Sequence, residues 1–98
     1  MTLNIQTVNF DADVKLTDHI KRKIAKINTF HDRIIKVDVF LKLDNVVHQI
    51  KDKIAEIKVS IPKSELFVKI TSKSFEESFD NALDSICNQI KKKKEKAA

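Results

Sequence analysis

The sequence predicts an α+β fold, a two-layer sandwich in which two helices pack on one face of a four-stranded, mostly antiparallel sheet in the order βαβββα. In four stretches, apolar residues alternate with polar ones, which is typical of half-buried strands. In two other stretches, apolar residues recur every three or four positions, which is typical of amphipathic helices. Because each element has one apolar face, stacking the helices on the sheet buries all of these faces.

The first half of the chain is predicted to form a strand, a helix and a second strand. Leu3 and Ile5 alternate with polar neighbours, so we expect the first strand to end near Val8. Asp13 is a suitable N-cap for the helix that follows. The apolar stripe of this helix consists of Leu16, Ile20, Ile24 and Ile27. The alternation that predicts the second strand is formed by Ile35, Val37, Val39, Leu41 and Leu43.

The next part of the chain is predicted to form two further strands. Residues 44–53 are polar enough for a long hairpin loop, with Asp44 and Asn45 supplying the turn. A tighter turn at residues 62–65 leads into a strand around residues 66–71. The alternating residues of the third strand are Ala55, Ile57, Val59 and Ile61.

The final element is predicted to be a helix that begins at a capping box, with Ser74 at the N-cap and Glu77 three residues later. Its apolar stripe consists of Phe79, Leu83, Ile86 and Ile90. Because the following inward positions are lysines, we expect apolar burial to stop near Ile90. The sequence therefore predicts a single domain over residues 1–90 and a basic helical extension or tail over residues 91–98.

The 98-residue chain contains no glycine. This excludes a dinucleotide-binding fingerprint, a Walker phosphate loop, a nucleophile elbow and an EF-hand loop, because each needs the backbone freedom of glycine. Any phosphate must therefore be bound by side chains. The turns must also place other residues in the left-handed region, and we expect Asn45 or Lys63 to adopt it.

Nineteen lysines and arginines against fourteen acids give a net charge of +5, which suggests an anionic partner. Positive charge is concentrated on the polar side of the first helix and after the last apolar residue of the second. These residues are Lys21, Arg22, Lys23, Lys26, Lys91, Lys92, Lys93 and Lys94. A solvated face would explain the first group, and the helix macrodipole favours lysines at a helix end. Neither explains four consecutive lysines, whose mutual repulsion a polyanion would relieve, so we predict salt-sensitive binding of nucleic-acid phosphates.

No combination of residues indicates catalysis or a metal site. The single cysteine, Cys87, leaves no internal disulfide or CxxC motif, and we expect it at the edge of the core. His31 and Asp32 are neighbours, but no motif positions a nucleophile beside them. The other histidines, His19 and His48, lack metal-binding spacing. We therefore expect no enzyme activity, metal or cofactor. With no apolar run of membrane-spanning length and no signal peptide, we expect a cytoplasmic protein.

Several segments, taken in order, carry a resemblance to a known family. They are MTLNI at residues 1–5, KIAKI at residues 23–27, DRI at residues 32–34 with VDVFLKL at residues 37–43, residues 72–83, and the basic ending. Together they resemble the ribosome hibernation-promoting factor family, also called the ribosome-associated inhibitor or sigma-factor modulation family. The likeness covers nearly the whole chain and agrees with the βαβββα order.

The resemblance implies a short-form ribosome hibernation factor, because the chain lacks the extra C-terminal domain of long-form members. Such a protein would bind the small ribosomal subunit between head and body, compete there with mRNA and tRNA, and preserve idle ribosomes in stationary phase or stress. Occlusion requires no reaction, and we expect a monomer away from the ribosome. The basic positions that match the family are Lys23, Lys26, Lys42 and Lys92. The distribution of charge adds Lys21, Arg22, Lys91, Lys93 and Lys94.

The chain also departs from the family pattern. Phe79 stands where the family commonly has tyrosine, the loop at residues 44–53 is longer, and a glycine near the end of the last strand is absent. Two alternatives remain open. One is a stand-alone module for double-stranded RNA, which would need lysines where this chain has Glu76 and Glu77. The other is a protein-interaction domain that modulates transcription.

Overall fold

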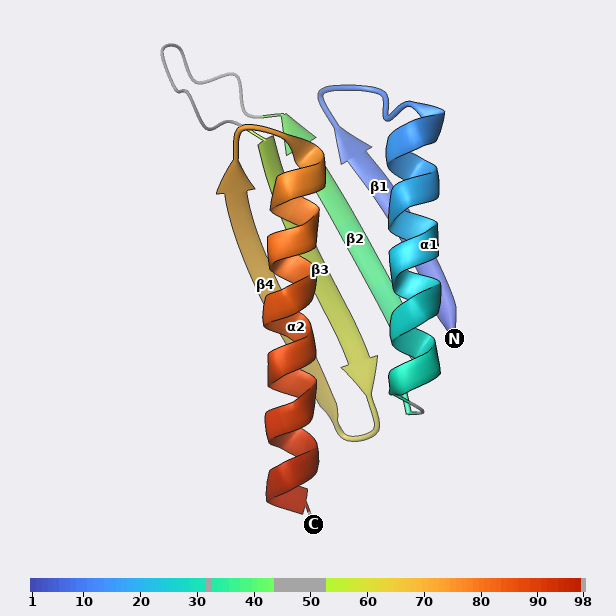
Figure 1. Cartoon of the computed structure of the whole chain (residues 1–98), viewed down its shortest axis with the longest axis vertical. Coiled ribbons are helices and arrows are strands. Elements are labelled where there is room, and N and C mark those ends of the chain that lie inside the picture. The colour runs from blue at the N-terminus through green and yellow to red at the C-terminus, as the bar shows by residue number, and fades with distance from the viewer. Residues whose placement is uncertain (32, 44–52, 98) are drawn as a thin grey trace.

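The element order in the computed structural model is βαβββα, as the periodicity predicts (Figure 1). The structure describes residues 1–31, 33–43 and 53–97, with the side chains of Phe30 and residues 94–97 left out of the description. The strands and helices are β1 (Thr2–Val8), α1 (Val14–Phe30), β2 (Lys36–Leu43), β3 (Lys53–Ile61), β4 (Ser64–Ser72) and α2 (Phe75–Ala97). The loop was predicted over residues 44–53; residues 44–52 lie outside the described residues, and Lys53 is the first residue of β3.

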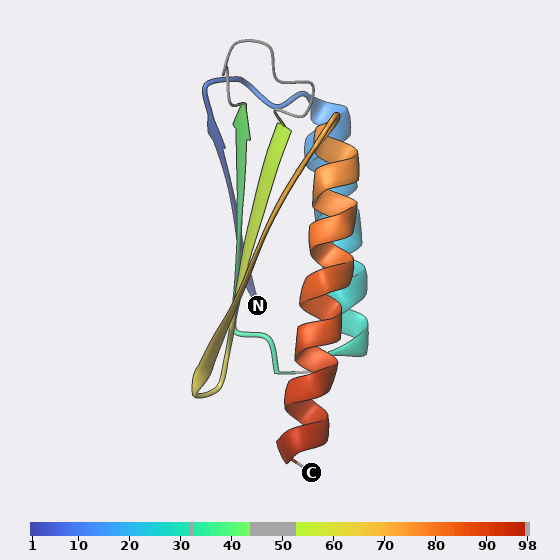
Figure 2. The same ribbon diagram turned by 90° about the vertical axis from the view of Figure 1, so that its left-hand side faces the viewer.

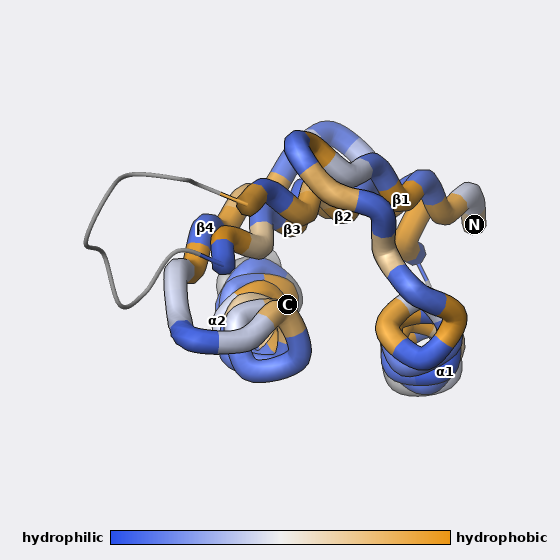
Figure 3. Tube along the Cα trace, turned by 90° about the horizontal axis from the view of Figure 1, so that it is seen from above, coloured by the Kyte–Doolittle hydropathy of each residue, from blue (hydrophilic) through white to orange (hydrophobic). Residues whose placement is uncertain are grey.

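The four strands form one mixed sheet in the order β1-β2-β3-β4. β1 and β2 are parallel, with Leu3 opposite Val37, because α1 returns the chain to the starting edge before β2 begins. The other two pairs are antiparallel, with Val39 opposite Ile57 and Ile57 opposite Val68. Both helices lie on the same face of this sheet and leave the other face uncovered (Figure 2). Seen from above, α1 lies on the β1 side and α2 beneath β3 and β4 (Figure 3).

The core is the layer where the inward side chains of the strands meet the apolar stripes of the two helices. The predicted stripes are confirmed: Ile20 and Ile24 of α1 and Phe79 and Ile86 of α2 are at most 1% exposed. Fully burying one such side chain contributes about 1.5–3 kcal/mol. Since each helix turns its apolar stripe toward the sheet, its charged residues face away from the sheet or along its flanks.

Both predicted helix starts are confirmed by their hydrogen bonds. The backbone N–H of Leu16 donates to Asp13 Oδ1 at 2.8 Å, and the backbone N–H of Glu77 donates to Ser74 Oγ at 3.1 Å. These bonds satisfy backbone donors that have no partner within the first turn of a helix. α2 continues without a break to Ala97, so residues 91–97 are part of this helix.

One predicted core residue is wrong. Ile35 was expected to point inward with the alternating residues of β2, but it lies before the strand and is 55% exposed. Ile34 is buried in its place. The chain here crosses from the helix layer to the sheet layer, so regular alternation begins only at Lys36.

The chain makes its turns without glycine by placing two other residues in the left-handed region. Asn9 has φ 70° and Lys63 has φ 65°. The prediction is thus confirmed for Lys63, whereas Asn45 lies outside the described residues. Lys63 follows Pro62 in the two-residue turn between β3 and β4, and proline followed by a residue with positive φ is the combination found in type II turns.

We predict that Lys63→Gly stabilises the protein. Glycine adopts the left-handed conformation without the steric cost that lysine has, which should raise the free energy of unfolding by about 1–2 kcal/mol. Glycine also makes the unfolded chain more flexible, which lowers the free energy of unfolding by about 0.4–1 kcal/mol. The expected net rise in the free energy of unfolding is about 0.5–1 kcal/mol, measured by urea denaturation. Lys69→Gly, at an exposed position within β4, is the control and should lower stability by a similar amount. A loss of stability in Lys63→Gly would contradict the argument.

Candidate nucleic-acid interface

The side of α1 that faces α2 is basic. Arg22, Lys23 and Lys26 lie three, four and seven residues after His19, so they share its side of the helix. His19 in turn reaches α2, where its Nε2 lies 2.7 Å from Asp80 Oδ1. The structure therefore brings three of the four predicted residues of α1 together beside the second helix.

His19 also contacts Arg22 on its own helix: Arg22 Nη2 lies 3.3 Å from His19 Nδ1, while His19 Nε2 contacts Asp80. Because a guanidinium can only donate, Nδ1 is the acceptor in the contact with Arg22, which leaves Nε2 to donate to the Asp80 carboxylate. The imidazole also packs edge-on against the buried Phe79 ring, with the ring centroids 6.0 Å apart. This network fixes one cation of α1 relative to α2.

Lys21 is not part of this group. It is two residues after His19, which places it roughly 200° around the helix axis, on the other flank of α1. Its side chain is exposed. Lys15, four residues before His19, does lie on the basic side and is exposed. Lys15 was not among the residues predicted to bind RNA, although its spacing from Lys23 and Lys26 places it on the same side of a helix.

The described lysine side chains at the basic end of α2 point in different directions around the helix axis and do not form a single face. Lys91, Lys92 and Lys93 are exposed, and successive residues point about 100° apart. Lys91 shares a side with Cys87, whereas Lys93 extends toward the turn between β3 and β4. Lys94 belongs to the same helix, but its side chain is outside the described set. This end of α2 reaches beyond the end of α1 (Figure 1).

Lys42 lies away from the helix lysines, on the uncovered face of the sheet. Its neighbours Leu41 and Leu43 point toward the helices, so Lys42 points the other way. Its Nζ is 3.0 Å from Oε2 of Glu56, a carboxylate that is only 14% exposed. The alternation in β2 is enough to predict that Lys42 lies on the opposite face from the helix lysines, because the apolar residues of β2 mark the face that the helices cover.

Charge is thus sorted between the two faces of the molecule. The uncovered sheet face carries three ion pairs between described residues, namely Lys36–Asp38 at 3.7 Å, Lys42–Glu56 at 3.0 Å and Lys58–Glu65 at 3.5 Å. None of the lysines whose side chains are described in α1 and α2 forms an ion pair. The helix layer therefore holds positive charge that no carboxylate of the described residues compensates at short range.

The remaining candidate residues offer little chemistry. Cys87 is a half-buried free thiol at the edge of the core, as predicted. Burial and then the Asp84 carboxylate raise its pKa, while Lys91 lowers it. His31 is buried at the end of α1, where its backbone N–H donates to Ile27. No group of three metal-binding side chains occurs among the residues that the structure describes. In that same part of the chain, neither helix combines the length and apolar character needed to cross a membrane.

A comparison with known protein families gives one clear match. The family model described as "Sigma 54 modulation protein / S30EA ribosomal protein" matches residues 3–98. The chain belongs to this family. The resemblance carried by the sequence segments is therefore confirmed at the level of the S30EA family.

Curated relatives are similar along most of this chain. A ribosome hibernation promotion factor of Bacillus subtilis is 29% identical over 92 residues, covering 94% of this chain and 46% of its own length. The chain thus spans about half the length of that relative. A ribosome hibernation promoting factor of Escherichia coli K12 is 26% identical over 96 residues, covering 98% of this chain and 96% of its own length.

Two solved structures share the fold of this chain at lower sequence identity. A ribosomal subunit interface protein from Coxiella burnetii superimposes with a TM-score of 0.82 at 19% identity, covering 96% of this chain and 98% of that one. The N-terminal domain of Thermus thermophilus Protein Y superimposes with a TM-score of 0.77 at 22% identity, covering 94% and 98% of the two chains.

We predict that Cys87 reacts slowly with iodoacetamide and that its neighbours control the rate. The raised pKa keeps the thiol protonated near neutral pH, and only the thiolate reacts. Asp84→Asn removes a negative charge that disfavours the thiolate, so the pH dependence of the alkylation rate should shift to lower pH. Lys91→Gln removes a positive charge that favours the thiolate, so the same curve should shift to higher pH. Asp18→Asn in α1 is the control and should leave the profile unchanged. An Asp84→Asn profile that overlays the wild-type profile would contradict the assignment.

Proposed function

We propose that this S30EA-family protein is a ribosome hibernation factor that binds the small ribosomal subunit in the mRNA and tRNA channel, inhibits translation and preserves inactive ribosomes under stress or in stationary phase. The observation that carries the proposal is the distribution of ion pairs: among the side chains that the structure describes, the helix lysines form none, whereas lysines on the uncovered sheet face are paired with carboxylates. The names of the relatives in Bacillus subtilis and Escherichia coli support the same role.

The RNA contact would be made by phosphates lying along the helix layer. Arg22, Lys23 and Lys26 supply one group of cations, and the basic end of α2 supplies the second, from Lys91 to Lys94. Lysine presents a point charge, so this surface follows the RNA backbone instead of reading its bases. Each neutralised phosphate releases counterions, which makes binding strongly dependent on salt.

Inhibition follows from occupancy alone. The molecule measures 47 × 24 × 18 Å, and a body of that size seated in the channel excludes mRNA and tRNA. We propose no reaction, cofactor or metal for this protein. We also propose that it acts on ribosomes in the cytoplasm and is a monomer away from them.

Lys21 and Lys42 have lesser parts in this proposal. Lys21 lies on the far flank of α1 and would contact only RNA that extends past that helix. Lys42 lies on the opposite face of the molecule and is paired with Glu56. Lys42 can contact RNA only if its ion pair with Glu56 is broken. Substitution of Lys42 should therefore weaken RNA binding less than substitution of Lys26.

We predict that Lys23→Glu/Lys26→Glu/Lys92→Glu abolishes co-sedimentation with ribosomes in sucrose gradients of cell lysate, because it replaces attraction to phosphate with repulsion. The matched control is Lys36→Glu/Lys58→Glu/Lys69→Glu, which changes the charge equally on the uncovered sheet face and should retain binding. Single Lys26→Glu and Lys42→Glu variants then compare the two faces, and circular dichroism checks the fold of each.

Three outcomes would contradict the proposal. Wild-type protein that remains at the top of a low-salt gradient would favour a protein-interaction domain. Equal loss of binding in both triple variants would indicate attraction by net charge alone. Binding to purified double-stranded RNA as tight as binding to small subunits would favour the stand-alone RNA module.

A further inference from the structure

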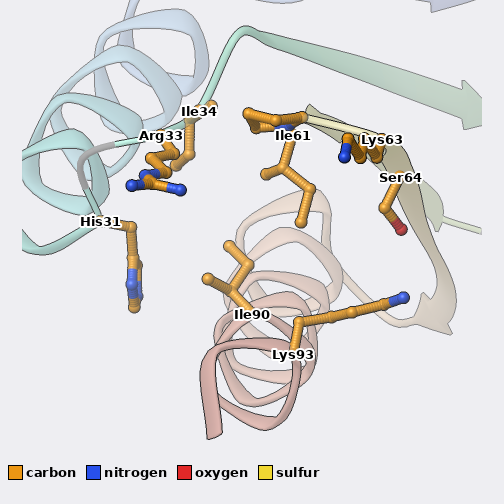
Figure 4. Close-up of a pocket in the computed structure, with 9 residues that line it drawn as sticks. His31, Arg33, Ile34, Ile61, Lys63, Ser64, Ile90 and Lys93 are labelled. Atoms are coloured by element: carbon orange, nitrogen blue, oxygen red, sulfur yellow. The ribbon is translucent and has the colours of Figure 1, made fainter. Parts of the chain in front are cut away.

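A pocket of about 240 Å³ lies at the end of the molecule that holds the basic end of α2 (Figure 4). Three parts of the chain form it: the segment between α1 and β2, the turn between β3 and β4, and the last turns of α2. Each part supplies one cation, respectively Arg33, Lys63 and Lys93. Among the residues that the structure describes, no aspartate or glutamate lines the pocket; Asp32, next to Arg33 in the sequence, is not one of the described residues. These three cations are 30 residues apart in the sequence, and only the fold brings them to one site.

Apart from His31 and Ser64, the described residues that lie between these cations in the pocket lining are apolar. Ile61 and Ile90 point toward one another across the cavity, and Ile34 adds to the same lining (Figure 4). An apolar interior with cations at its edge suits a ligand that has a flat, weakly polar part and an anionic part. Its volume is below the range of about 300–1,000 Å³ typical of pockets for drug-sized ligands, so it fits a single ring system.

The turn between β3 and β4 places the side chain of Lys63 beside this site. Lys63 occupies a left-handed backbone position that disfavours lysine, unlike Asn9, which is of a residue type often found there. Here the unfavourable position places an ammonium group at the edge of the pocket. Neither Lys63, Arg33 nor Lys93 forms an ion pair within the described part of the chain.

We propose that the pocket receives one unstacked nucleotide of the RNA that the helices bind. The base would lie against the isoleucines, while Arg33, Lys63 and Lys93 would hold the adjoining phosphates. The argument for RNA over a free small anion is continuity, because Lys93 belongs to both the pocket and the basic end of α2. Lys92 and Lys93 also line a neighbouring hollow, so the positive surface continues from the pocket along the helix. This inference rests on the proposed ribosome-binding function.

The test uses two variants that alter the pocket in different ways. Ile61→Trp fills the cavity without changing charge, and Arg33→Gln/Lys63→Gln removes cations without filling it. The control, Lys58→Gln/Lys69→Gln, removes the same charge from the uncovered sheet face. All variants are checked for cooperative thermal unfolding. Two affinities are then measured, one for small ribosomal subunits and one for a single-stranded oligoribonucleotide that contains 2-aminopurine, whose fluorescence reports unstacking of that base.

We expect both pocket variants to bind small subunits roughly tenfold more weakly than the control does, since contacts of a single base are typically worth that much or more. We also expect 2-aminopurine fluorescence to change with wild-type protein and not with Ile61→Trp. If wild-type protein binds subunits and both pocket variants bind equally well, the pocket proposal is wrong while the proposed function stands. If wild-type protein does not bind subunits, the proposed function is wrong, and an unchanged 2-aminopurine signal would separately overturn the pocket proposal.

Discussion

Burial of two apolar helix stripes against a single face of one sheet is the constraint on which the rest of this structure depends. Ile20 and Ile24 of α1 and Phe79 and Ile86 of α2 all contact the same apolar layer. Once both helices lie on that face, their polar sides can only point away from the sheet or toward each other. The helix lysines therefore gather in one layer, and the opposite face of the sheet remains open to solvent.

The two faces of the molecule differ in whether their lysines are paired with carboxylates. Cross-strand and same-strand neighbours on the open sheet face form short ion pairs, each of which is worth at most about 1 kcal/mol at a surface. On the helices, the lysines whose side chains the structure describes repel one another without such partners. That repulsion disfavours the free protein slightly and favours its complex with a polyanion. The proposed RNA surface is thus the face whose charge the fold leaves uncompensated.

The absence of glycine has consequences at the same site. Without a glycine-rich loop, phosphates can be held only by side chains, and the tight turn between β3 and β4 must place Lys63 at φ 65°. The turn needs that backbone angle whichever residue occupies it. A lysine there places an ammonium group beside the apolar pocket between α1, the turn and α2. One position therefore links the stability of the hairpin to the proposed binding of a nucleotide.

The sequence by itself determined the element order, both helix caps, the apolar stripes, the family and the concentration of lysines in two segments, because each of these is a local pattern or an ordered set of local patterns. The alternation in β2 also placed Lys42 on the outer face. Only the tertiary structure decided that His19 reaches Asp80, and therefore which flank of α1 faces α2, and that a pocket forms between distant segments. Contacts of that kind depend on how one layer is placed on another. The periodicity of the sequence does not predict how the layers are placed, because their placement depends on the packing of side chains from remote segments.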